Sequence, residues 1–197
     1  MIDARRAMIG ALTTTIAVSI PVFLVGGLAV QIGFTPGGLG LAVSAYFGAS
    51  ALASVPAGSL VERYGETRTA RAGIALATVS LFGIALAGHT LWILAAILAL
   101  GAAANAMGQL ASNTSLSRHV PVHRQGFSFG VKQAAIPVST LLAGMAVPAV
   151  ALTVGWRWAF VLAGLLTAAA IALVPVEAAA PRPAGGESPK RTGGALG

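Results

Sequence analysis

The chain alternates between long apolar runs and short polar gaps. A helix that crosses a bilayer needs about 20 consecutive, mostly apolar residues. Six runs approach or exceed this length, so we predict an all-α integral membrane protein with six transmembrane helices. The predicted spans are 9–30, 39–60, 72–88, 91–111, 127–152 and 158–174.

The remaining segments are predicted to lie outside the bilayer. Residues 62–71 form the most charged gap and residues 112–125 form a second polar gap, and both are predicted as loops. Residues 175–197 are rich in Pro, Gly and Ala with scattered charges. This composition is typical of flexible segments, so we expect a cytoplasmic linker or tail there.

Two features within the predicted spans concern helix packing. Four prolines lie within three of the spans, and neighbouring helices can accommodate them in a membrane bundle. Gly40, Ser44 and Gly48 repeat every four residues along the second span. Small residues at this spacing let two helices approach closely, and we predict that the stripe serves ordinary packing within the bundle.

The composition strengthens the membrane assignment. Hydrophobic residues make up 56% of the 197 residues and charged residues only 9%, whereas soluble domains carry about 25% charged residues. A soluble fold of this size could not bury so much apolar surface. The chain contains no cysteine, which excludes disulfides, thiol catalysis and thiolate metal sites.

The distribution of charge predicts the topology. The net charge is +7, from 12 Lys and Arg against 5 Asp and Glu. The basic residues lie in the polar gaps rather than along one face, so nucleic acid is not a predicted partner. With a cytoplasmic N-terminus, ten of the twelve would be cytoplasmic, Arg157 would be external and Lys132 would lie within a span. Because excess Lys and Arg stay in the cytoplasm, we predict a multi-pass plasma-membrane protein with both termini cytoplasmic.

One ionisable residue, Lys132, falls within a predicted span. Such residues are costly in a bilayer and mark candidate functional sites. We predict that Lys132, with Gln133 beside it, faces a central cavity and favours an anionic substrate such as a small organic acid. The alternative is a lysine side chain that reaches back to the membrane interface.

A polar pair in the fourth span completes the predicted substrate-cavity set. Asn105 and Gln109 lie four residues apart, so they share one face of the helix. A polar stripe in lipid faces the bundle or a cavity. Two interpretations stay open: the pair lines a substrate path, or it forms hydrogen bonds between helices.

Catalytic chemistry is not predicted. The sequence shows no nucleophile–base pair and no phosphate-cradling glycine loop. His119 and His123 are separated by Pro121, and two histidines are too few for a metal site. We therefore predict neither an enzyme nor a bound metal or cofactor.

A sequence motif follows the second span. Its characteristic residues are Gly58, Leu60, Glu62, Arg63, Gly65 and Arg68. The motif resembles the signature of the major facilitator superfamily of secondary transporters, Gly-x-Leu-x-Asp-Arg-x-Gly-Arg-Arg, found between helices two and three. Glu62 replaces the usual aspartate, and Glu66 with Thr67 replaces the paired basic residues. Residues 124–130 and 155–160 resemble the family's entries to helices five and six.

The resemblance covers residues 9–174 and implies one six-helix half of a twelve-helix transporter, with this chain as an N-terminal fragment. It implies transport of a small solute by alternating access. The implied partners are the bilayer, the solute, and either the missing C-terminal half or a second copy. The fourth span lacks the arginine that many proton-coupled members carry, so proton coupling is not predicted.

The resemblance also implies a role for the motif after the second span. Glu62 and Arg63 would form a latch that holds the two halves in one access state, although these charges could instead only fix the topology. The alternative function is a non-transporting membrane sensor or anchor. The polar residues within the spans argue against that alternative.

Overall fold

The computed structural model describes residues 3–88 and 90–175. These residues form helices, without a β-strand among them. The elements are α1 (Ala4–Ile32), α2 (Pro36–Tyr64), α3 (Glu66–Ala87), α4 (Leu91–His119), α5 (Val122–Gln133), α6 (Ala135–Ala146), the π-helix η1 (Val147–Ala151), α7 (Trp156–Ala170) and the 3₁₀ helix η2 (Ile171–Leu173). Six helical stretches are long and apolar enough to cross a membrane, which confirms the predicted all-α membrane fold.

The helices extend beyond the predicted spans, and both predicted polar loops are wrong. α2 ends at Tyr64 and α3 begins at Glu66, so residues 62–71 are almost wholly helical. α4 continues to His119, which makes residues 112–125 mostly helical as well. Polar residues end an apolar run without ending the helix, because the backbone can stay hydrogen-bonded outside the bilayer. The predicted linker, residues 175–197, lies outside the described residues except for Pro175.

The turn between α1 and α2 illustrates how local sequence ends one helix and starts the next. Gly33 closes α1 with a φ of 92°, a left-handed conformation that glycine adopts readily. Thr35 then caps α2, because its hydroxyl accepts a hydrogen bond from the Gly38 N–H at 3.2 Å. Pro36 occupies the first turn, where its missing N–H is not needed.

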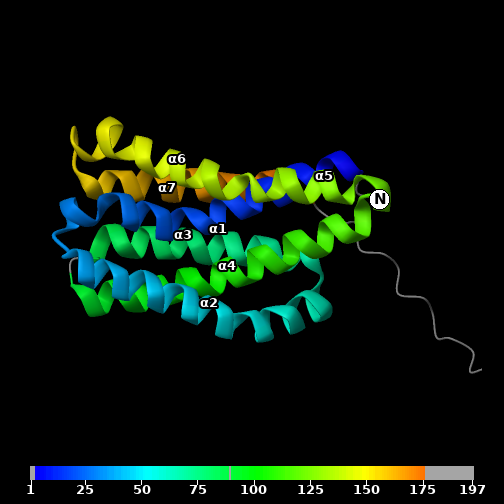
Figure 1. The fold of residues 1–197 in the computed structure, drawn as a ribbon, viewed down its shortest axis with the longest axis horizontal. Helices are drawn as coiled ribbons and strands as arrows, with labels where there is room; N and C mark the ends of the chain where they lie inside the picture. The colour runs from blue at the N-terminus through cyan, green and yellow to red at the C-terminus, as the bar shows by residue number, and fades with distance from the viewer. Residues whose placement is uncertain (1–2, 89, 176–197) are drawn as a thin grey trace, which may run out of the picture.

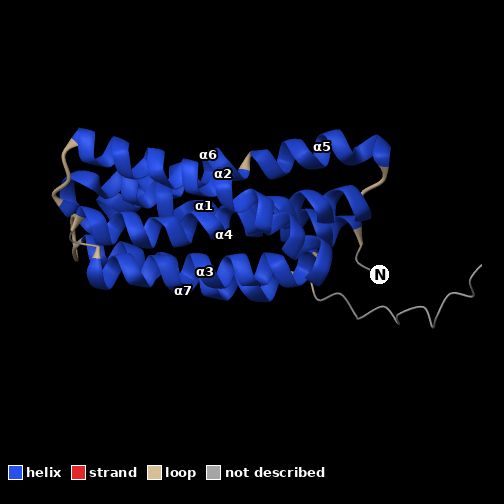
Figure 2. Ribbon diagram, turned by 90° about the horizontal axis from the view of Figure 1, so that it is seen from below, coloured by secondary structure: helices blue, strands red, loops and turns tan. Residues whose placement is uncertain are grey.

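The helices are arranged around a central pair (Figure 1). α1 and α4 pack against each other, α2 packs on α4 at one side, and α6 packs on α1 at the other. α2 and the α5–α6 helix therefore form two opposite flanks of the bundle. α3 and α7 pack against each other on the back of the central pair (Figure 2).

One end of the bundle carries most of the basic residues, and it is called the basic end below. The beginning of α1, the α2–α3 junction and the α4–α5 junction all lie there (Figure 1). These segments contain seven arginines: Arg5, Arg6, Arg63, Arg68, Arg71, Arg118 and Arg124. Arg157 lies at the opposite end, at the start of α7. The grouping of these elements matches the charge asymmetry that the sequence predicted.

Glycines allow the central helices to approach closely. A Cβ atom added to Gly108 of α4 would lie 2.7 Å from Val18 of α1. A Cβ atom on Gly73 of α3 would lie 3.1 Å from the carbonyl oxygen of Ala104 in α4. Both distances are shorter than ordinary van der Waals contact, so only glycine fits where α1, α3 and α4 meet.

The small residues of the flanks lie on outer faces instead. Among the described residues, no atom outside the adjoining backbone of the same helix comes within 4 Å of the space that a Cβ would occupy on five of the exposed glycines. These are Gly40 and Gly48 on α2, and Gly126, Gly130 and Gly144 on α5 and α6. The prediction that the stripe Gly40, Ser44 and Gly48 packs within this bundle is therefore wrong.

The fifth apolar helical stretch, Val122–Ala151, is interrupted near each of its two prolines. Pro137 has no N–H to donate to the carbonyl four residues earlier, and the helix breaks at Ala134 between α5 and α6. Pro148 lies in η1, where the Leu152 N–H bonds the Val147 carbonyl at 3.0 Å. The first break follows Lys132 within two residues.

Candidate functional site

Lys132 is buried between α5 and α4 and joins the two helices. Only 3% of the residue is exposed. Its ammonium group donates hydrogen bonds to the Gln109 side-chain oxygen and, at 3.0 Å, to the Asn113 side-chain oxygen. The side chain therefore extends across to α4 rather than back along α5 to the membrane interface. Gln109 and Asn113 are four residues apart, so one face of α4 presents both oxygens.

The partners of Lys132 are polar but carry no charge. Among residues 3–88 and 90–175, Glu66 forms a salt bridge with Arg118 and lies near His119, and Lys132 takes part in neither contact. Amide oxygens solvate an ammonium group without neutralising it. A lysine offers three N–H donors, of which two are used here. A protonated Lys132 thus keeps one donor that no described residue uses.

Asn113 is a member of the site that the sequence prediction missed. It lies on the same α4 face as Asn105 and Gln109, one turn beyond Gln109, but the span was predicted to end at Ala111. The four-residue spacing would have identified Asn113 if the helix had been continued. Gln109 is partly buried and Asn113 is exposed. The two amides therefore lead from the buried ammonium toward the surface near the basic end.

The other predicted cavity residues do not join Lys132. Asn105 donates a hydrogen bond from its amide nitrogen to the Ser50 hydroxyl at 3.1 Å, which links α4 to α2. Gln133 is exposed on α5, while the neighbouring Lys132 side chain points into the bundle. The α4 polar face therefore serves both flanks: Asn105 contacts α2, and Gln109 contacts the α5 lysine.

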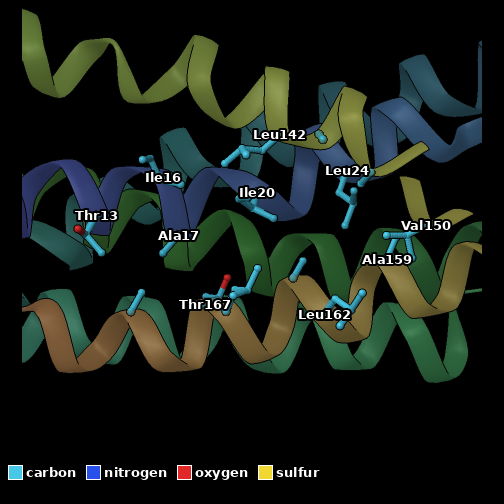
Figure 3. Close-up of a pocket in the computed structure, with 15 residues that line it drawn as sticks. Thr13, Ile16, Ala17, Ile20, Leu24, Leu142, Val150, Ala159, Leu162 and Thr167 are labelled. Carbon is cyan, nitrogen blue, oxygen red and sulfur yellow. The ribbon is translucent and has the colours of Figure 1, made fainter. Parts of the chain in front are cut away.

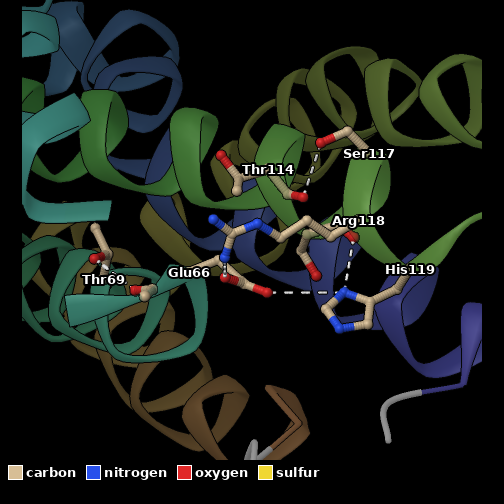
Figure 4. Close-up of polar contacts among 8 residues, drawn as sticks. Glu66, Thr69, Thr114, Ser117, Arg118 and His119 are labelled. Atoms are coloured by element: carbon tan, nitrogen blue, oxygen red, sulfur yellow. Dashed lines mark hydrogen bonds and ion pairs between the residues drawn. The ribbon is translucent and has the colours of Figure 1, made fainter. Parts of the chain in front are cut away.

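A second polar cluster lies at the basic end, between α3 and α4 (Figure 4). Glu66, at the start of α3, is only 2% exposed. One of its carboxylate oxygens accepts a hydrogen bond from the Arg118 guanidinium at 2.8 Å. The Nδ1 atom of His119 lies 3.7 Å from the other oxygen and 3.0 Å from the Ser115 carbonyl oxygen. This cluster ties the first turn of α3 to the last turn of α4.

The predicted motif after the second span lies on both sides of a single connecting residue. Gly65 links α2 and α3 with a φ of 82°, which favours glycine. Glu62 and Arg63 are exposed, and neither forms an ion pair with another described residue. Arg63 lies over the ring of Tyr64 at 5.4 Å. Two further motif residues, Gly58 and Arg68, are half-buried and exposed, respectively.

The paired acid of this region is therefore Glu66 and not Glu62. The sequence resemblance emphasised Glu62 because it occupies the acidic position of the signature. Glu66 occupies a position where the signature has a basic residue. Its partner Arg118 was assigned to a loop, so the sequence prediction did not bring the two charges together.

The geometry above defines a class of protein, which comparison with known families identifies. The described residues form six apolar helices of membrane-spanning length, and the fourth helix carries a polar face. Residues 7–195 match the model of the Major Facilitator Superfamily, and the chain belongs to this family. The bundle fits the N-terminal half of that fold. No individual curated protein matches the chain significantly.

Proposed function

We propose that this chain is one half of a secondary transporter that moves a small organic anion across the plasma membrane by alternating access. The observation that carries the proposal is the buried ammonium of Lys132, which two neutral amide oxygens bind and which has no acidic partner among residues 3–88 and 90–175. An uncompensated charge in a membrane bundle is costly. An anionic solute that binds at the unused donor would lower that cost.

A second six-helix bundle would complete the transport path. Transporters built from repeats bind substrate near the midplane, between the two halves. Both flanks of this bundle present exposed glycines with open space above them, and small residues permit close contact between membrane helices. We propose that α2 and the α5–α6 helix contact either the missing C-terminal half or a second copy of this chain.

Glu62 and Arg63 are proposed to form the latch between the bundles. Both are exposed at the basic end, next to the α2 flank. Glu66 has its partner within this half, whereas Glu62 and Arg63 remain accessible to charges on a second bundle. The charge bias favours cytoplasmic termini, so the latch would act on the cytoplasmic side.

The bundle is better suited to transport than to anchoring or catalysis. A non-transporting sensor or anchor has no need of a buried lysine bound by amide oxygens. Members of this family are transporters rather than enzymes, and we propose no catalytic, metal-binding or cofactor-binding role for this chain.

Uptake measurements test the anion proposal. The complete transporter, with both bundles present, would be reconstituted into liposomes and supplied with labelled small carboxylates or with uncharged solutes of similar size. Lys132→Gln should lower carboxylate uptake about ten- to a hundredfold, because a charged hydrogen bond contributes about 1.5–3 kcal/mol. Lys132→Arg keeps the charge and should retain much of the uptake. Unchanged uptake of every carboxylate by Lys132→Gln, in a protein that remains folded, would contradict the proposal.

Reconstitution of this chain alone tests the need for a second bundle. One bundle provides one wall of the path, so we expect no saturable uptake of a solute that the complete transporter carries. Crosslinking would measure the oligomeric state in the same liposomes. Saturable uptake by a homodimer would identify a second copy, rather than a C-terminal half, as the partner.

A further inference from the structure

An apolar groove runs along the bundle between α1, α6 and α7 (Figure 3). Its volume is about 350 Å³. The α1 wall extends from Thr13 to Leu24 and the α7 wall from Ala159 to Ala170. At 1.5 Å per residue, each wall is about 16 Å long. The groove therefore follows the helix axes over about half the thickness of a bilayer core.

The groove opens to the surroundings of the bundle. α6 and α7 each pack on α1, and α7 also contacts η1 at the end away from the N-terminus. Leu142 of α6 and Leu162 of α7 line the groove and are each 44% exposed. Leu166, one turn further along α7, is 73% exposed. These exposed leucines form the rims of the groove.

The lining selects a hydrocarbon occupant. Thr13 and Thr167 are the only lining residues with polar side chains. A water molecule in a protein needs two to four polar partners, so water would fill this space poorly. An apolar cavity of about 150 Å³ stays dry and binds benzene, so an apolar groove of about 350 Å³ favours hydrocarbon over water. A long, narrow, apolar groove that opens to the bilayer suits a single acyl chain.

The N-terminal end of the groove adds positive charge to this apolar site. Arg6 lies seven residues before Thr13, which places it on the same face of α1 two turns nearer the basic end. Ile9 lies between them on that face and is 45% exposed, so it continues the apolar track. Arg5 is also exposed beside Arg6, and neither arginine forms an ion pair with another described residue. Asp3 is the nearby acid on α1, at its N-cap position.

We propose that this groove binds one acyl chain of an anionic phospholipid, whose phosphate lies against Arg5 and Arg6. The apolar walls hold the chain, and the arginines select the negatively charged headgroup. Juxtamembrane basic residues attract anionic lipids. The site lies on the face of the bundle away from the α2 flank, and the inference does not depend on the transported solute.

Lipid competition tests the headgroup part of this inference. The purified full chain in detergent would be titrated with phosphatidylglycerol or with phosphatidylcholine carrying the same acyl chains, and binding would be followed by native mass spectrometry. Each arginine should contribute about a fivefold preference for the anionic lipid, so the wild type should prefer it about 25-fold. Arg5→Gln with Arg6→Gln should remove most of this preference. Arg157→Gln, at the opposite end, is the matched control and should retain it.

Photocrosslinking tests the groove itself. A phosphatidylglycerol with a diazirine in one acyl chain should label residues 13–24 and 159–170 several-fold more than the exposed outer face of α2. Ala163→Phe fills the groove and should reduce this labelling at least fivefold. Ala169→Phe, on the exposed face of α7 outside the groove, should not. Equal binding of the two lipids by the wild type, or uniform labelling of all lipid-facing helices, would overturn the proposal.

Discussion

Two polar clusters join α4 to its neighbours, and they differ in charge balance. At the basic end, Glu66 of α3 meets Arg118 of α4 at 2.8 Å, so a buried carboxylate has a cationic partner. Deeper in the bundle, the polar partners of Lys132 of α5 within the described part of the chain are the amide oxygens of Gln109 and Asn113. Among the residues that the structure describes, the first cluster has a partner of opposite charge, whereas the second has none.

This difference separates a structural role from a functional one. A buried charge with an opposite partner can hold two helices together without any further ligand. A buried charge without one remains a liability for stability, since desolvation of an ion is expensive. The Glu66 cluster is therefore expected to stabilise the fold, and the Lys132 cluster is expected to serve binding at some expense of stability.

The largest effect on stability is expected from the Glu66 cluster. Arg118→Ala would leave the Glu66 carboxylate buried without its ion-pair partner, and an unsatisfied buried group costs about 1–3 kcal/mol, more when charged. Because Arg118 is 57% exposed, solvent screens the pair, and we expect a loss of about 2 kcal/mol. Chemical unfolding in detergent micelles would measure it. Arg124→Ala, which changes an exposed arginine at the same end, is the control. Equal losses of unfolding free energy in the two variants would show that the Glu66–Arg118 pair does not stabilise the fold.

Removal of the lysine charge should have the opposite sign or no effect. Lys132→Met keeps the length and apolar stem of the side chain, and replacing a buried charge by an apolar group is often neutral or stabilising. We expect the free energy of unfolding to stay constant or to rise by about 1 kcal/mol, measured in the same micelles. A loss of unfolding free energy comparable to that of Arg118→Ala would show that Lys132 stabilises the fold, and the two clusters would then not differ in role.

A smaller effect is expected at the hydrogen bond between the α2 flank and α4. Asn105→Ala removes the contact with Ser50, and such bonds between membrane helices contribute about 0.6 kcal/mol on average. A double-mutant cycle with Ser50→Ala would isolate the pair energy. A coupling energy near zero would instead leave Asn105 free to line a substrate path, the interpretation that the sequence left open.

The smallest effect on stability is expected at the proposed latch. Glu62→Ala and Arg63→Ala change exposed residues, and surface substitutions usually alter stability by less than about 0.5 kcal/mol. In the complete transporter, however, both should shift the access equilibrium. Since the chain has no native cysteine, single cysteines at Thr35 and Ser117 would report accessibility at the two ends. Unchanged labelling of both probes, combined with weaker solute binding, would argue against a latch.

The sequence alone predicted the larger features of the molecule well. Six apolar runs are enough to specify six membrane helices, because a bilayer leaves the backbone few ways to satisfy its hydrogen bonds. The same reasoning singled out Lys132, since an ionisable residue within an apolar run is rare. The grouping of arginines at one end also followed from their spacing between spans.

The partners of each charged group could not be predicted in the same way. Asn113 and Arg118 were assigned to a loop because apolar periodicity ends at Ala111, although α4 continues to His119. The error concealed both polar clusters, since each uses a residue from the last turns of α4. A change in hydropathy along the chain marks where the chain leaves the bilayer, but the helix can continue beyond that point.

The sequence by itself determined which segments enter the membrane and which end of the bundle is basic, because these properties depend on local composition. Only the tertiary structure decided that Glu66 pairs with Arg118, that Lys132 pairs with amide oxygens and not with an acid of the described residues, and that α1, α6 and α7 leave an apolar groove between them. Those features depend on which faces of distant helices meet. Contact between helices is fixed by close packing at residues such as Gly73 and Gly108, and no periodicity along one helix encodes the face of its neighbour.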